Sequence, residues 1–248
     1  TPLYSSAASD VYKRQIEFKQ LSKAVKALKG GDGSALQDPV YLFIQVHLGY
    51  FLANLGRQIE CEVVSAPCLK PLQKLGMTAE LAICLHNLGT SAEFRGEYQL
   101  SGQLLEEAIE VGQRYPSAAY YSFYLWLGYV YFLMGKYEDG MRSFTTCLKW
   151  WLDQGNHWAA AFALSKMGLA ADGLGQHAAA LEYHQQAMRI FLDSGDIGGQ
   201  AYSFGRMSIG AYFLDEYDQS ASYARESLRL FEKIGHRWGS CASRSHLG

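Results

Sequence analysis

The chain has 248 residues, of which 49% are hydrophobic and 19% are charged, and its formal net charge is −2. This composition supplies a substantial core, and its mixed charges give no surface that would follow a nucleic-acid backbone, so we expect no direct nucleic-acid partner. The apolar stretches are interrupted well before the roughly 18 residues of a membrane span. The five cysteines form no CxxC pair, which argues against a disulfide framework or zinc site and favours a reducing cytoplasm.

The first residues carry no repeat signal. The end of the string TPLYSSAASDVYKRQ, residues 1–15, resembles translated sequencing-adapter read-through, so this segment is interpreted as an artefact outside the fold. Residues 16–37 are interpreted as a partial N-terminal repeat and a loop, with a second helix at 16–29. At the other end, the chain stops within a predicted helix, and we expect it to be a fragment of a longer protein.

From residue 38 onward, a small residue returns at a nearly constant interval. The step is 40 residues, with one step of 39. A period of this size indicates a repeat architecture rather than a globular enzyme domain. The residues that define position 0 of each copy are Gly49, Gly89, Gly128, Gly168, Ser208 and Gly248.

Two further positions cut each copy into two helices, because glycine readily takes the left-handed conformation that ends a helix. Position +7 holds Gly56, Gly96, Gly135, Gly175 and Asp215, and position +27 holds Gly76, Pro116, Gly155, Gly195 and Gly235. We expect first helices at about 40–55, 78–95, 117–134, 157–174 and 197–214. We expect second helices at about 59–74, 99–114, 138–153, 178–193 and 218–233.

Small residues also recur at positions +12 and +19, for example Ala180 and Ala187. Together with position 0 they allow helix axes to approach within about 8–10 Å. Two such helices cannot bury their apolar faces alone, so the copies must stack. The expected copies are 38–77, 78–116, 117–156, 157–196, 197–236 and a partial copy at 237–248.

Two places depart from the pattern. Pro67 and Pro71 lie inside the second helix of the first copy, where proline kinks or ends a helix. Either that helix is bent, or it restarts near Ser65 with Pro67 in its first turn. The 39-residue step is a one-residue deletion between Pro116 and Gly128.

The third copy shows the pattern most clearly, with Tyr124–Tyr131, then Gly135-Lys136-Tyr137, then small Gly140 and Cys147. It resembles the tetratricopeptide repeat, over residues 38–248. The resemblance implies an all-α, right-handed α-α superhelix of helix-turn-helix units. The 40-residue form is similar to the arrays of bacterial signal-transduction ATPases, transcription regulators and nucleotide cyclases, most closely in segments 190–196 and 230–239.

In such arrays the first helices line a concave wall, and by resemblance the wall positions are −6, −3, +1, +4 and +5. Arrays that clamp a peptide carboxylate place Asn and Lys at −3 and +1, and neither occurs there in this chain, so a chaperone-tail clamp is not expected. The candidate binding residues are Phe43, Val46, Tyr50, His86, Thr90, Phe94, Leu125, Tyr129, Phe132, Phe162, Leu169, Asp172, Tyr202, Ile209, Tyr212 and Phe213.

Nothing in the sequence indicates catalysis. It contains no GxxxxGK[ST], HExxH or GxSxG motif, so we expect no enzyme activity, no catalytic residue and no cofactor. His177 and His184 share a helix face, but no third metal ligand is evident, so no metal site is expected.

The predicted function is a non-catalytic scaffold for protein–protein interaction, within a larger cytoplasmic bacterial protein of signalling or transcriptional regulation. Its partner is a protein or an apolar or amphipathic peptide, or another domain of the same polypeptide. The alternative is a sensor array that binds a small molecule or signal peptide in its groove. A further alternative is that the aromatic wall residues simply fill the superhelix, and the oligomeric state stays open.

Overall fold

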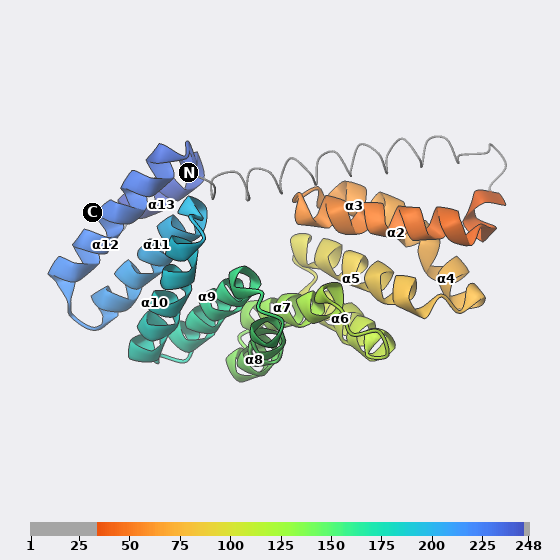
Figure 1. Cartoon of the computed structure of the whole chain (residues 1–248), viewed down its shortest axis with the longest axis horizontal. Coiled ribbons are helices and arrows are strands. Elements are labelled where there is room, and N and C mark those ends of the chain that lie inside the picture. The colour runs from red at the N-terminus through yellow and green to blue at the C-terminus, as the bar shows by residue number, and fades with distance from the viewer. Residues whose placement is uncertain (1–33, 246–248) are drawn as a thin grey trace. The chain divides into compact units, whose positions relative to one another are not determined.

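The computed structural model describes residues 34–245, and all regular structure in that range is helical. The predicted helix at 16–29 and the end of the partial copy lie outside the described residues. The chain divides into two compact units, whose described parts are residues 34–134 and 135–245 (Figure 1). We call them the N-terminal unit and the C-terminal unit.

The N-terminal unit contains helix pairs that pack in sequence order. Its main core joins α2, α4, α5, α6 and α7 through buried side chains that include Leu42, Leu72, Leu85, Ala108 and Phe123. The elements are η1 (Ser34–Gln37), α2 (Pro39–Asn54), α3 (Gln58–Ser65), η2 (Ala66–Cys68), α4 (Leu69–Leu75), α5 (Thr78–Phe94), α6 (Tyr98–Gly112) and α7 (Ala118–Leu133).

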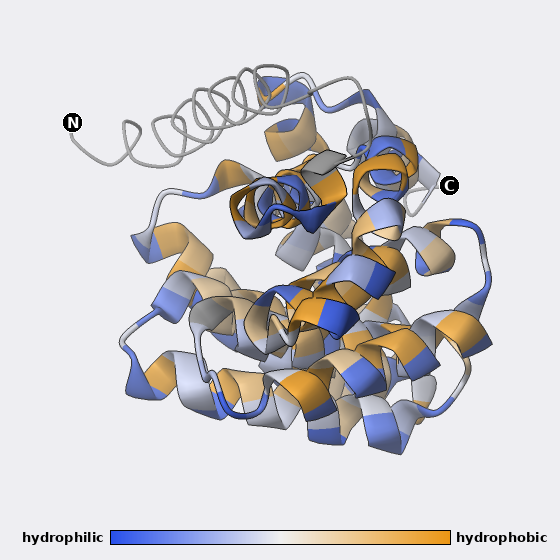
Figure 2. Ribbon diagram, turned by 90° about the vertical axis from the view of Figure 1, so that its right-hand side faces the viewer, coloured by the Kyte–Doolittle hydropathy of each residue, from blue (hydrophilic) through white to orange (hydrophobic). Residues whose placement is uncertain are grey.

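The C-terminal unit repeats the same hairpin, and each helix packs against the next one along the chain. Figure 2 shows hydrophobic and hydrophilic residues interleaved along the helices, as expected where one side of a helix is buried. The elements are α8 (Tyr137–Asp153), α9 (His157–Gly173), α10 (His177–Asp193), α11 (Ile197–Phe213), α12 (Tyr217–Lys233) and α13 (Arg237–Ser245).

The predicted all-α fold of paired helices is confirmed, and the backbone explains why the helices end where they do. Every glycine at +7 and +27 has a positive φ, from 67° at Gly76 and Gly155 to 79° at Gly96. Asp215 takes the same conformation with φ 62°. The exception at +27 is Pro116, where α6 ends early, and the side chain of Ser117 caps α7 by accepting from the Tyr120 amide at 3.2 Å.

The two sequence departures have visible consequences. A 3-10 turn at Ala66–Cys68 breaks the second helix of the first copy, and α4 begins at Leu69. The 3-10 turn follows Ser65 as its N-cap and has Pro67 at its start, and Pro71 lies in the first turn of α4. That turn tolerates proline because its amides have no acceptor within the helix. The one-residue deletion corresponds to α7, which has 16 residues where α5 has 17.

The small residue at position 0 is where the two helices of a copy touch. A Cβ atom added to Gly49 would lie 2.2 Å from Oγ of Ser65, and one added to Gly168 would lie 2.4 Å from Cε1 of His184. Both partners stand at position +16, the residue on the second helix that faces the lattice glycine. No side chain fits between the helices at these points, so glycine fixes their contact.

The small residue at +19 is also buried. Replacing it by a larger side chain tests the helix contact at this position, which we call the buried seam. Ala187 has no exposed surface and packs with Ala161, Leu164 and Phe191. We expect Ala187→Leu to lower the free energy of unfolding by about 1–3 kcal/mol, because the added carbons overpack a close contact. Chemical denaturation measures this change. Ala178→Leu, on the exposed side of the same helix, is the control, and equal stability of the two variants would contradict the buried seam.

Asp215 offers a test of the helix ends. Its left-handed backbone is strained for any residue with a Cβ atom, although its carboxylate accepts a hydrogen bond from the Tyr217 hydroxyl at 2.6 Å. Asp215→Ala should cost about 1 kcal/mol, because it keeps the strain and loses that bond. Asp215→Gly relieves the strain and should match or exceed the wild-type melting temperature. A glycine variant less stable than the alanine variant would refute this account.

Candidate functional site

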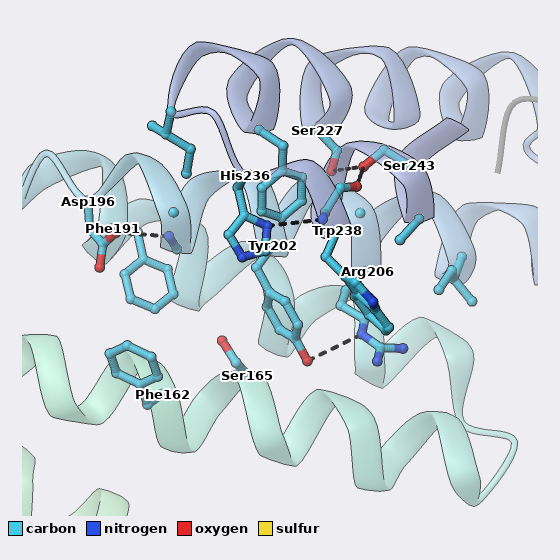
Figure 3. A pocket seen from close by; sticks show the side chains of 18 of the residues that line it. Phe162, Ser165, Phe191, Asp196, Tyr202, Arg206, Ser227, His236, Trp238 and Ser243 are labelled. Carbon is cyan, nitrogen blue, oxygen red and sulfur yellow. Dashed lines mark hydrogen bonds between the residues drawn. The ribbon is translucent and has the colours of Figure 1, made fainter. Parts of the chain in front are cut away.

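A groove of about 670 Å³ opens in the C-terminal unit, over the first helices α9, α11 and α13 (Figure 3). Its volume lies within the usual range of about 300–1,000 Å³ for ligand sites. The lining combines aromatic side chains with glycines, serines and a few charged groups. It consists of Phe162, Ser165, Lys166, Phe191, Asp196, Gly198, Gly199, Tyr202, Gly205, Arg206, Ile209, Ser227, Phe231, Ile234, His236, Trp238, Gly239, Ala242 and Ser243.

Helix geometry explains why these first-helix residues share the groove. Each residue advances the helix by about 100°, so positions −6, −3 and +1 lie about 60–120° around the axis from the lattice residue. They form one face, about a quarter turn from the contact with the second helix. Phe162 and Tyr202 at −6 and Ile209 at +1, all predicted wall residues, line the groove together.

Two phenylalanine rings enter the groove from the ends of second helices. A Cβ atom added to Gly199 would lie 2.4 Å from the ring of Phe191, and one added to Gly239 would lie 2.5 Å from the ring of Phe231. Each ring therefore lies flat on a glycine of the next copy. The N-terminal unit holds the inverse pair, with glycine at 112 and the aromatic ring of Tyr120 3.0 Å from its added Cβ. This large–small pairing joins consecutive copies.

Most polar groups at the groove already have partners. Asp196 accepts from the Gly199 amide at 2.9 Å and from Trp158 Nε1 at 3.0 Å. His236 Nδ1 accepts from the Gly239 amide at 3.0 Å. Figure 3 shows Asp196 at one end of the groove and Arg206 at the other. Asp196 and His236 therefore hold the starts of α11 and α13 in place.

Arg206 is different, because its partner is an aromatic ring. Its Nε donates to the hydroxyl of Tyr202 at 3.3 Å, and its guanidinium carbon lies 5.5 Å from the centre of that ring. Lys166 stands at the same repeat position, −2, on α9 and also lines the groove. One edge of the groove is therefore basic.

The remaining predicted residues of the C-terminal unit lie outside this groove. Leu169 is buried, whereas Tyr212 and Phe213 are exposed at the end of α11, where Phe213 stacks on His177 with ring centres 4.3 Å apart. Oδ1 of Asp172 lies 3.2 Å from Nδ1 of His177. Positions +4 and +5 thus lie beside the helix-ending turn rather than on the groove wall.

Asp172 is the acidic neighbour that links the two histidines of the predicted helix face. Its second oxygen lies 3.9 Å from Nε2 of buried His184, too far for a hydrogen bond. Burial lowers the pKa of His184, which therefore stays neutral at neutral pH. No group of three His, Cys, Asp or Glu residues within 34–245 is arranged to hold a metal ion.

In the N-terminal unit, the predicted wall is filled in part. Val46, His86 and Thr90 are buried, and the His86 ring stacks on Phe123 with centres 4.7 Å apart. Burial lowers the pKa of His86 to about 4. Tyr50 completes this cluster, 5.6 Å from His86 between ring centres. Of the other predicted residues, the exposed ones are Phe43 and Phe94, and the partly buried ones are Leu125, Tyr129 and Phe132.

Sequence reasoning missed two wall positions. Gly198 and Trp238 stand at −10, one helical turn before −6 on the same face, and extending the pattern by a turn would have found them. Lys166 and Arg206 at −2 lie about 20° beyond the predicted stripe, whose outermost position is +5. The sequence feature that could have indicated them is the recurrence of a basic residue at position −2 in two adjacent copies.

A tetratricopeptide-repeat family model matches residues 117–193. Residues 117–193 therefore carry the tetratricopeptide-repeat signature. No curated protein sequence matches it. No helix within residues 34–245 combines the length and the apolar character needed to cross a membrane.

Solved structures share the fold of this chain at low sequence identity. BtubC (BKLC) from P. vanneervenii is 13% identical with a TM-score of 0.71, over 90% of this chain and 92% of its own. A Rap protein complexed with Competence and Sporulation Factor is 12% identical with a TM-score of 0.71, over 93% and 69%. Nearly identical TPR-like repeats of a putative kinesin light chain from Podosopora anserina are 13% identical with a TM-score of 0.63, over 79% and 98%.

The glycines of the groove give a matched pair of variants. Gly199→Ala would place a methyl group inside the Phe191 ring, so the ring must move, and we expect a loss of about 1–3 kcal/mol. Gly198→Ala meets only a side-chain oxygen of Asp196, at 3.4 Å, and should be neutral or slightly stabilising. Thermal unfolding of both variants measures the difference. Equal melting temperatures would show that Phe191 does not press on Gly199.

Proposed function

We propose that this chain is a non-catalytic interaction module that holds a peptide segment of a partner protein in the groove over α9, α11 and α13. The observation that carries the proposal is the groove itself, in which aromatic side chains of first and second helices surround a volume of about 670 Å³. Proteins bind extended or helical segments in such channels through apolar side chains. The tetratricopeptide fold suits this role.

Exposed aromatic surface supports the same function. Trp238 lines the groove and is 83% exposed. Its indole is therefore accessible to a partner that enters the groove. Aromatic residues at a groove supply large buried areas to a binding partner at small cost in side-chain entropy.

We further propose that the module belongs to a cytoplasmic bacterial protein of signalling or transcriptional regulation. The support is the resemblance of segments 190–196 and 230–239 to arrays of that group. Both segments contribute to the groove, through Phe191 and Asp196 in the first and through Phe231, Ile234, His236, Trp238 and Gly239 in the second. The occupant is then a segment of a signalling partner or of another domain of the same polypeptide.

A second candidate function is sensing of a small molecule or free signal peptide. The observation that favours it is the Rap protein, which has the same fold over 93% of this chain and was solved with Competence and Sporulation Factor bound. A sensor must change its conformation when the ligand binds. Hydrogen exchange that slows only in the groove helices supports a scaffold, and a ligand-dependent change that extends to α2–α7 supports a sensor.

A single substitution tests the groove. Gly198 stands where other copies carry Trp158 and Trp238, so the fold accommodates tryptophan at this position. We expect Gly198→Trp to fill the groove and to weaken binding of peptides selected from a randomised phage library by at least about tenfold, measured by calorimetry.

The matched control is Leu192→Trp on exposed α10 surface, which should leave the affinity unchanged. Comparable thermal stability of both variants would show that a loss of affinity does not result from a loss of folding. If the selected peptides bind Gly198→Trp as tightly as the wild type, the groove is not the binding site.

A further inference from the structure

The helix contact of the fourth copy contains an ionisable side chain. Position +16, which faces the lattice glycine, holds His184 there, whereas the other copies carry side chains that do not titrate near neutral pH. Those residues are Ser65, Leu105, Phe144 and Ala224. His184 is fully buried, and a Cβ atom added to Gly168 would lie 2.4 Å from its Cε1 and 2.5 Å from its Nε2. Its ring therefore lies directly against α9.

The ring of His184 is buried without hydrogen bonds. Within residues 34–245, neither of its nitrogens has a hydrogen-bond partner, and neither has Oδ2 of Asp172. That oxygen lies 3.9 Å from Nε2 of His184, whereas Oδ1 of the same carboxylate lies 3.2 Å from Nδ1 of His177. A charged imidazole has two N–H groups, and each needs an acceptor when it is buried. The closed contact between α9 and α10 therefore suits the neutral ring.

The charged groups around His184 come from both helices that pack closely on α10. The carboxylate of Asp172 on α9 favours the charged imidazole, and the guanidinium of Arg206 on α11 opposes it. On α10 itself, His177 shares the carboxylate. Burial is the largest effect, and it lowers the pKa of His184 below the ordinary value of about 6.5. A proton therefore binds more readily to His184 where α9 and α10 are apart than where they touch.

The same helix contact continues to the groove. Beyond His184, α10 presents Ala187 and Phe191 at steps of three and four residues, and both pack with Leu164 of α9. At the end of this row, the rings of Phe191 and Phe162 meet at a steep angle with centres 5.3 Å apart. Both rings line the groove (Figure 3). Separation of the helices at His184 therefore acts on this part of the groove wall.

We propose that the α9–α10 hairpin is acid-sensitive, so that proton uptake by His184 separates its ring from Gly168 and loosens the groove wall at Phe162 and Phe191. Above about pH 6.5 the ring is neutral in the closed and the open form, and the contact is fully stable. Below that pH, each unit shifts the balance toward the open form by up to about tenfold. The shift ends where the pH reaches the lower pKa of the closed form.

Leucine at position 184 separates protonation from packing. The second copy already carries leucine at +16, where an added Cβ atom of Gly89 would lie 2.9 Å from Cγ of Leu105. The fold therefore accommodates His184→Leu. Hydrogen exchange of the full chain, measured by mass spectrometry between about pH 7.5 and about pH 5.5, follows the opening of α9 and α10. Comparison with the wild type at the same pH removes the intrinsic pH dependence of amide exchange.

The wild-type hairpin should open more in acid than the variant hairpin. We expect the ratio of wild-type to His184→Leu exchange rates in α9 and α10 to rise by up to about tenfold between about pH 6.5 and about pH 5.5. The ratio in α2–α7 should stay constant. His157→Gln, at an exposed histidine, is the control and should follow the wild type. A ratio in α9 and α10 that does not change with pH overturns the proposal.

Two neighbouring charges provide a test that keeps His184 in place. Asp172→Asn removes the carboxylate that favours the charged ring, so it should lower the pKa of His184 further and enlarge the opening in acid. Arg206→Gln removes the opposing charge and should do the reverse. Nuclear magnetic resonance titration of the His184 ring measures these shifts. A wild-type ring that titrates at about pH 6.5 or above while α10 stays protected from exchange refutes the proposal.

Discussion

The close contact between the two helices of a copy depends on the small residue at position 0, which is Ser208 in the fifth copy and glycine in the others. At Gly49, Gly89 and Gly168, an added Cβ atom would lie 2.2, 2.9 and 2.4 Å from the partner residue at +16. The partners Ser65, Leu105 and His184 differ widely in size and polarity, so the constraint belongs to the glycine rather than to its neighbour. Because the contact fixes the rotation of the first helix, it also determines which residues face away from the second helix.

The groove is a consequence of that fixed rotation. Residues about a quarter turn from the glycine line it, and the phenylalanine–glycine pairs at the junctions add rings from the preceding second helices. The same pairs join one copy to the next, so the side chains that hold consecutive copies together also form part of the groove wall. A ligand that presses on Phe191 or Phe231 therefore acts on the packing between copies.

The sequence alone predicts whatever depends on backbone conformation. Glycine at +7 and +27 ends helices through a local preference, and eight glycines of the described chain have positive φ as that preference requires. What depends on packed neighbours could not be predicted in the same way. The burial of His86 arises from Phe123 on another helix, and Asp196 is occupied by the Trp158 indole of α9 as well as by the Gly199 amide of α11. The sequence predicts that the helix is interrupted near Pro67. It does not predict which residues form the 3-10 turn.

The volume of the side chain at −3 explains why an equivalent face is filled in one unit and hollow in the other. In the N-terminal unit, position −3 holds Val46 and His86, which are buried, with His86 against the Phe123 ring, and Leu125, which is partly buried. In the C-terminal unit it holds Ser165 and Gly205, which cannot occupy the same volume, and both line the groove. Since the backbone hairpin is the same, a few atoms at one recurring position decide whether the repeat packs against itself or leaves space for a partner.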